Sequence, residues 1–147
     1  MSKPSYPRMH TAEHILNQTM VRVLESDRCF SAHINSKKSK CDYHFDRTMT
    51  DEEAVEVEMR VNDVLASGLA VIEEMMPVNQ AAELFNLSRL PDPDVDVVRI
   101  VHVGEYDACP CIGEHVSNTA EIGAFRLVSH SWEEGVLRLR FKLSAPV

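Results

Sequence analysis

Long hydrophobic runs and an excess of positive charge are both missing from this sequence of 147 residues. It contains no run of about eighteen apolar residues, so we expect neither a transmembrane helix nor a membrane partner. The first eight residues lack the apolar core of a secretory signal, and we therefore expect a cytoplasmic protein. The sequence has no internal repeat, and its length fits one domain, here residues 1–147.

Acidic residues outnumber basic ones, with 23 Asp and Glu against 15 Lys and Arg and a formal charge of -8. This balance argues against a DNA partner and against non-specific nucleic-acid binding, because phosphate contacts require Lys and Arg. It leaves room for a protein that touches only the tip of a nucleic acid. One basic cluster, Lys37, Lys38 and Lys40, falls in an expected hairpin turn. This cluster is either a solvated turn or a contact for a phosphate group, and both interpretations stay open.

The pattern of apolar residues predicts an α+β protein, with an antiparallel sheet and helices packed on one face. Helices are expected from Thr11 to Glu25, from a capping box at Thr50 and Glu53 to Gly68, and briefly after Pro77. A loop that forms the site is expected over 104–118. Strands are expected over 29–34, 40–45, 69–73, 95–103, 124–131 and 136–143.

Two short pairs, His10 with His14 and Cys111 with His115, place metal-capable side chains four residues apart. Alone, each pair is weak evidence, and Glu13 is not adjacent to His10 as a zinc-protease motif requires. Together they form a nitrogen and sulfur set that suits Zn²⁺, between the first helix and a late loop. Four protein ligands are typical of structural zinc, whereas catalytic zinc keeps one position open. Both alternatives stay open. In a cytoplasmic chain the four cysteines are expected to be free thiols or ligands.

The segment from His10 to Leu16 resembles the opening motif of the alanyl-tRNA synthetase editing domain. The segment from Cys111 to Phe125 resembles its second signature, and the intervening residues follow the family's order. The chain is similar to the short, stand-alone AlaX group of trans-editing proteins, which are related to the editing domain of threonyl-tRNA synthetase. The resemblance implies a Zn²⁺-dependent hydrolase that deacylates mischarged tRNA at its acceptor end, with Ser-tRNA(Ala) as the expected substrate.

The second motif departs from the family's usual Cys-Gly-Gly-Thr-His at Ile112 and Glu114. Glu114 is either a carboxylate that orients a ligand histidine or a solvated loop residue, and we name it as a catalytic candidate. Asp107 has the same two interpretations, and a surface position is favoured.

An editing site that accepts serine needs a partner for its hydroxyl. Ser31 and His33, alternate residues of an expected strand, are the catalytic candidates for this role. The departures keep three alternatives open: a non-catalytic zinc-stabilised binding module, editing of Ser-tRNA(Thr), and hydrolysis of small aminoacyl esters.

Overall fold

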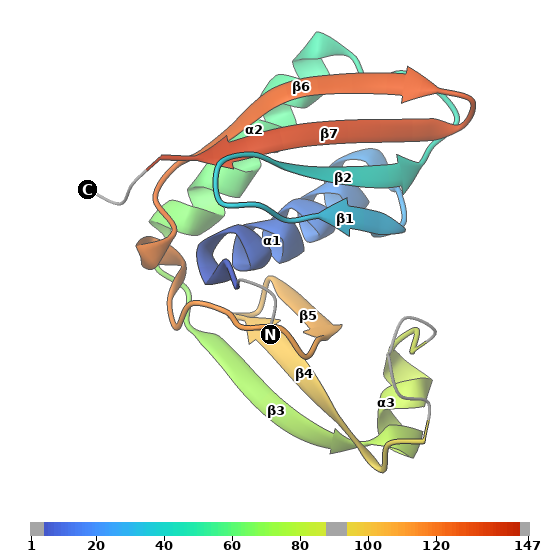
Figure 1. The fold of residues 1–147 in the computed structure, drawn as a ribbon, viewed down its shortest axis with the longest axis vertical. Helices are drawn as coiled ribbons and strands as arrows, with labels where there is room; N and C mark the ends of the chain where they lie inside the picture. The colour runs from blue at the N-terminus through green and yellow to red at the C-terminus, as the bar shows by residue number, and fades with distance from the viewer. Residues whose placement is uncertain (1–4, 88–93, 145–147) are drawn as a thin grey trace.

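The computed structural model describes residues 5–87 and 94–144, which form an α+β structure with two antiparallel sheets (Figure 1). The helices are α1 (Pro7–Leu24), α2 (Asp51–Ala66), α3 (Val78–Leu84) and the 3₁₀ helix η1 (Thr119–Glu121). The strands are β1 (Ser31–His33), β2 (Ser39–His44), β3 (Val71–Pro77), β4 (Val97–Val103), β5 (Asp107–Pro110), β6 (Phe125–Glu133) and β7 (Val136–Leu143).

The larger sheet has four strands in the order β1-β2-β7-β6, and α1 and α2 cover one of its faces (Figure 1). Side chains alternate along β7, so Leu137, Leu139 and Phe141 are fully buried in the main core with residues of α1 and α2. The same alternation turns Arg138 and Arg140 to the outer face, where both are partly exposed.

The smaller sheet has three strands in the order β3-β4-β5 and lies on the other side of α1 (Figure 1). It has its own small core, in which Met76, Val98 and Ile100 pack with Ala81 of α3. Strand β5 contacts α1. The first helix therefore lies between the two sheets, and residues that follow β5 are carried to its side.

The predicted α+β class and the antiparallel pairing are confirmed, but the prediction of one sheet is wrong. The segment expected as a loop over 104–118 contains β5, whose Cys109 pairs with Val101 of β4 and completes a second sheet. The Thr50 and Glu53 capping box is present at the start of α2. Helix α1 begins at Pro7, four residues before the expected start, because proline is tolerated in a first helical turn.

All four cysteines are free thiols, as expected. None of the helices in the described ranges combines the length and the apolar character needed to cross a membrane.

Candidate metal centre and its cavity

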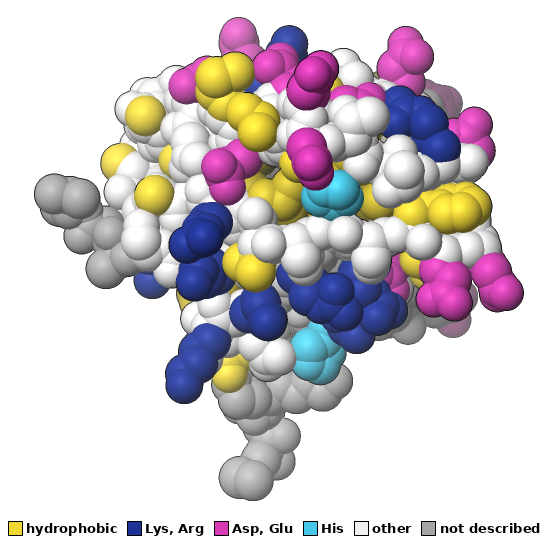
Figure 2. Space-filling model, turned by 90° about the horizontal axis from the view of Figure 1, so that it is seen from above, with side chains coloured by type: hydrophobic (Ala, Val, Ile, Leu, Met, Phe, Trp, Pro, Cys, Tyr) yellow, Lys and Arg dark blue, Asp and Glu magenta, His cyan; other side chains and the backbone are white. Residues whose placement is uncertain are grey.

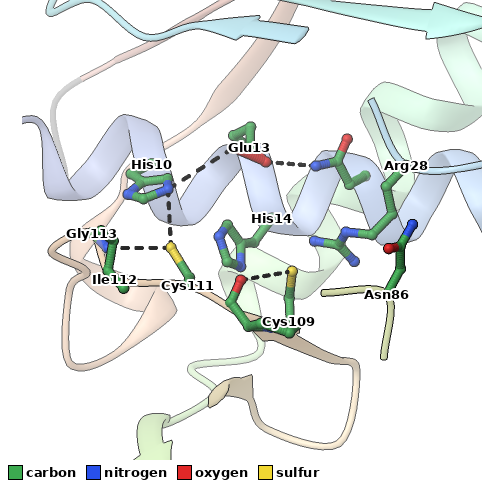
Figure 3. A pocket seen from close by; sticks show the side chains of 11 residues that line it. His10, Glu13, His14, Arg28, Asn86, Cys109, Cys111, Ile112 and Gly113 are labelled. Carbon is green, nitrogen blue, oxygen red and sulfur yellow. Dashed lines mark hydrogen bonds and ion pairs between the residues drawn. The ribbon is translucent and has the colours of Figure 1, made fainter. Parts of the chain in front are cut away.

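Two segments about a hundred residues apart in sequence meet at the metal-capable cluster (Figure 3). His10 and His14 lie one turn apart on α1, and Cys111 and His115 follow β5. One donor atom from each of the four side chains lies within 4.8 Å of the others. The structure thus brings together all four residues that the two sequence pairs predicted as ligands, and the cluster could bind a metal ion.

The Cys111 thiol contacts two of the three imidazoles of this cluster. Its Sγ is 3.4 Å from Nε2 of His10 and 3.4 Å from Nε2 of His115. The backbone amide of Gly113 also points at the sulfur, at 3.4 Å. The His10 and His115 rings are stacked, with centroids 4.3 Å apart. The nitrogen and sulfur donors therefore lie close together at a site where only His14 is fully buried.

Contacts on the far side of the ring fix the orientation of two of the three imidazoles, those of His115 and His10. Nδ1 of His115 lies 2.9 Å from the hydroxyl of Thr11, and His10 makes a backbone hydrogen bond with Glu114. Nδ1 of His14 is buried without a hydrogen-bond partner among the described residues, and its nearest carboxylate oxygen is Oδ2 of Asp107 at 3.8 Å. This pattern leaves Nε2 of His10 and of His115 directed at the cluster.

Asp107 is buried at the base of the site, so the favoured surface position is wrong. Its carboxylate accepts hydrogen bonds from Arg28 at 2.6 Å and Gln18 at 2.9 Å, and its side chain has no exposed area. These two partners anchor it beside His14, 3.8 Å from Nδ1, and its role in orienting that ring stays a prediction.

Burial keeps the three imidazoles of the cluster neutral. Desolvation lowers the pKa of His115 to about 3, with a further decrease from the neighbouring His10 and Arg99. Desolvation likewise lowers the pKa of His10 and places that of His14 well below its ordinary value. Burial raises the pKa of the Cys111 thiol. Neutral imidazole is the form that binds metals, so these rings are ready to act as ligands.

The loop that carries Cys111 is tied to the smaller sheet by Arg99 of β4. Its guanidinium donates to the carbonyl oxygen of Cys111 at 2.7 Å and to that of Gly113. Gly113 lies directly against the His10 ring, where a Cβ atom would overlap the imidazole. A residue without a side chain is therefore required there.

A cavity of about 340 Å³ opens beside the cluster and is bounded by α1 and the end of β5 (Figure 3). Its polar wall includes Glu13, whose Oε1 lies 4.0 Å from Nε2 of His10. Asn17 donates to the other oxygen of Glu13 at 2.5 Å, and Arg28 also lines the cavity. Sequence reasoning did not name Glu13 as a site residue, although its spacing of three from His10 places both on one helix face.

The three predicted catalytic residues lie in different places. Glu114 is exposed and lines a second cavity of about 370 Å³, together with His10 and Ile34. Ser31 and His33 are exposed on β1, the edge strand of the larger sheet, and neither of them lines these two cavities. The structure brings Glu114 close to the cluster and leaves Ser31 and His33 on the sheet surface.

Comparison with known proteins supports the resemblance deduced from the motifs. Residues 98–140 match the family described as threonyl and alanyl tRNA synthetase second additional domain. The chain is 34% identical over 123 residues to the alanine–tRNA ligase of Bacillus pumilus and 33% identical over 129 residues to that of Bacillus subtilis. Each alignment covers 83% of this chain and 14% of the relative.

A third relative, the alanine–tRNA ligase of Fervidobacterium nodosum, is 30% identical over 132 residues, which cover 89% of the chain and 15% of the ligase. The chain thus spans only a small part of the length of the ligases that it matches. It is an alanyl-tRNA synthetase editing-domain-like protein, as the motifs predicted.

Proposed function

We propose that this chain forms one editing domain that hydrolyses the ester of mischarged aminoacyl-tRNA in a zinc-dependent reaction, with Ser-tRNA(Ala) as its substrate. The observation that carries the proposal is the cluster of three neutral imidazoles and one thiol beside a polar cavity. Its setting in a chain related to alanine–tRNA ligases supports the choice of substrate.

The residues of the cluster fit Zn²⁺. With Zn–N bonds of about 2.0 Å and Zn–S bonds of about 2.3 Å, neighbouring ligands of a tetrahedral ion lie about 3.5 Å apart. The two distances of 3.4 Å from the Cys111 sulfur agree with that edge length. His10, His14, Cys111 and His115 would hold the ion. When bound, zinc would supply a Lewis acid that can polarise a carbonyl oxygen or lower the pKa of a water molecule.

Two carboxylates flank the place where an ester would enter. Glu13 lies on the cavity wall near His10, and its hydrogen bond from Asn17 fixes its orientation. We assign to Glu13 the role of binding the α-ammonium group of the amino acid, because a partly buried carboxylate attracts that positive charge strongly. Glu114, on the opposite side of His10, is the candidate that accepts a proton from the attacking water.

Discrimination between serine and alanine requires a hydrogen bond to the serine hydroxyl. Ser31 and His33 stay predictions for this role. Both lie on β1, which is followed directly by Ile34 in the wall of the second cavity, so a bound tRNA end would pass near them.

The test is hydrolysis of Ser-tRNA(Ala), Ala-tRNA(Ala) and Ser-tRNA(Thr) by one preparation whose metal content is also measured. We expect selective loss of serine from tRNA(Ala), with one zinc per chain and abolition by a chelator. Cys111→Ala is expected to lose both zinc and activity. Cys109→Ala is the matched control, because Cys109 lines the same cavity but lies outside the cluster, and it is expected to retain both.

Three outcomes would contradict the proposal in different ways. A zinc-loaded protein that hydrolyses no aminoacyl-tRNA would be a zinc-stabilised binding module. Attack on Ser-tRNA(Thr) alone would change the substrate and retain the chemistry. Equal turnover of a small aminoacyl ester and of Ser-tRNA(Ala) would remove tRNA from the function.

A further inference from the structure

The outer face of the larger sheet carries an unusual group of positive charges. Lys40 of β2 lies directly opposite Arg140 of β7, and Lys142 of β7 lies opposite Arg126 of β6. The turn between β1 and β2 adds two exposed lysines near Lys40 in sequence. We call these residues the basic face: Lys37, Lys38, Lys40, Arg126, Arg140 and Lys142.

Within residues 5–87 and 94–144, the charges of the basic face make no direct ion pair, although Lys40 and Arg140 act at longer range on Asp42 and help to lower its pKa. Two residues further back along β7, by contrast, Arg138 is paired with Asp42 at 2.7 Å. Like charges directly opposite one another across a ladder destabilise a sheet. The two like-charged pairs therefore carry a cost that a bound polyanion would remove.

The molecule as a whole is acidic, which makes the face more distinctive. Its net charge is -8, and Asp51, Glu52, Glu53, Glu56 and Glu58 all lie on α2, on the opposite side of the sheet. In Figure 2, dark blue side chains gather in the lower part of the view, and acidic ones lie mainly along the top and the right. An anionic partner would be attracted to one side of the molecule and repelled from the other.

The basic face ends at the candidate metal centre. Arg8, in the first turn of α1, donates to the carbonyl oxygen of Ser144 at 2.6 Å, so the end of β7 is tied to the turn that carries His10. On the other side, Ile34 follows β1 and lines the second cavity together with His10. The positive surface is thus connected to the cluster at both β1 and β7.

We propose that the basic face binds the phosphate backbone of the tRNA acceptor arm and directs its aminoacylated end past Ile34 to the cluster. The inference rests on the proposed function and extends it, because it assigns the surface that holds the RNA. Binding is electrostatic and independent of base sequence, since backbone contacts position a nucleic acid without reading it. His33, which lies opposite Lys40 on the edge strand, belongs to the same surface.

The test compares the double variant Lys40→Gln/Arg140→Gln with the control Arg47→Gln/Arg60→Gln. Both remove two positive charges, but Arg47 and Arg60 pair with Glu53 and Glu56 on the acidic side. Binding of uncharged tRNA is measured by fluorescence anisotropy over a range of salt concentrations. Hydrolysis of Ser-tRNA(Ala) and of seryl-adenosine, which has no phosphate, is measured in parallel.

We expect the basic-face variant to raise Kd and KM for tRNA about tenfold at about 0.1 M salt and to leave kcat unchanged. The slope of log Kd against log salt should decrease by about 1.4 to 1.8 in magnitude, which corresponds to two lost phosphate contacts. Seryl-adenosine should be hydrolysed at the unaltered rate. The control variant should match the unmodified protein in all of these measurements, and circular dichroism should give both variants the native spectrum.

An unchanged Kd and salt slope in the basic-face variant would overturn the inference, as would an equal loss in the control. An altered rate with seryl-adenosine would also overturn it, because it would indicate a disturbed site. Failure of the proposed function is a separate result. If the unmodified protein hydrolyses no ester, binding of uncharged tRNA still decides whether the basic face holds RNA.

Discussion

The hydroxyl of Thr11 lies 2.9 Å from Nδ1 of His115 and also accepts a hydrogen bond from the backbone amide of Val116 at 3.2 Å. One side chain of α1 therefore fixes both the ring and the backbone of the segment that carries His115. Because the ring is neutral, it holds one proton, and a proton on Nδ1 leaves Nε2 free to face the Cys111 sulfur.

Thr11→Val is expected to weaken zinc binding about 10- to 100-fold, because it removes the oxygen that orients His115 and retains the shape of the side chain. Competition with a chelator of known affinity measures the change. Thr11→Ser, which restores the hydroxyl, is the control and should bind zinc almost as well as the unmodified protein. Equal affinity in the valine and serine variants would show that this hydrogen bond does not tune the site.

Asp107→Asn is expected to lower the free energy of unfolding by about 3 kcal/mol, because it removes the buried carboxylate that pairs with the half-buried Arg28. The value lies at the lower end of the usual range because the Arg28 side chain is 29% exposed. Urea denaturation measures it. Glu56→Gln breaks the exposed ion pair with Arg60 on α2 and should cost under about 1 kcal/mol. Similar losses in the two variants would contradict a buried role for Asp107.

Gly113→Ala is expected to abolish stoichiometric zinc binding and to leave the fold intact. The added methyl group would overlap the His10 ring, which must then leave its position beside Cys111. Metal analysis of the purified variant and its circular dichroism spectrum test this. Ile112→Ala is the control. Ile112 is the preceding residue and its side chain is exposed, so this variant should retain zinc. Full zinc occupancy in Gly113→Ala would mean that His10 is not a ligand.

The cluster of four metal-capable residues could be predicted from sequence because each half of it is local. His10 and His14 are brought onto one face by the period of a helix, and Cys111 and His115 lie within a single short loop. A tetrahedral metal ion takes four such donors, so the two pairs are expected to come together in the fold. The capping box at Thr50 and Glu53 is predictable for the same reason, because both of its hydrogen bonds join residues three apart.

The second sheet and the base of the site could not be predicted in this way. Strand β5 has only four residues, Asp107–Pro110, and its sequence does not have the composition of a strand. It is extended because it pairs with β4. Asp107 is buried through Arg28 and Gln18, which belong to distant parts of the chain. No local pattern reports such contacts. The basic face has the same origin, because part of its charge comes from β2 and the turn before it and the rest from β6 and β7, about ninety residues later.

The capping box of α2 makes part of the stability depend on pH. Hydrogen bonds from Arg47 and from the backbone amide of Thr50 lower the pKa of Glu53 from 4.5 to about 2. A carboxyl group whose pKa is lower in the folded protein stabilises it above the unfolded pKa, and this contribution is lost as the pH falls towards the folded pKa. The contribution of Glu53 should therefore be complete above about pH 5 and should disappear between 4.5 and about 2.

Glu53→Gln is accordingly expected to lower the melting temperature at pH 7, and the difference from the unmodified protein should shrink steadily below pH 4.5. Thr50→Ala removes the other half of the box. It should lower the free energy of unfolding by about 1 kcal/mol both at pH 7 and below pH 4.5, because its hydroxyl does not titrate. Glu52→Gln is the matched control. It removes the same charge from the same turn. Among the described residues, the capping hydrogen bonds of α2 are made by Thr50 and Glu53 and not by Glu52. A pH-independent difference for Glu53→Gln, or an equal one for Glu52→Gln, would assign the effect to general charge at the helix start and not to the capping box.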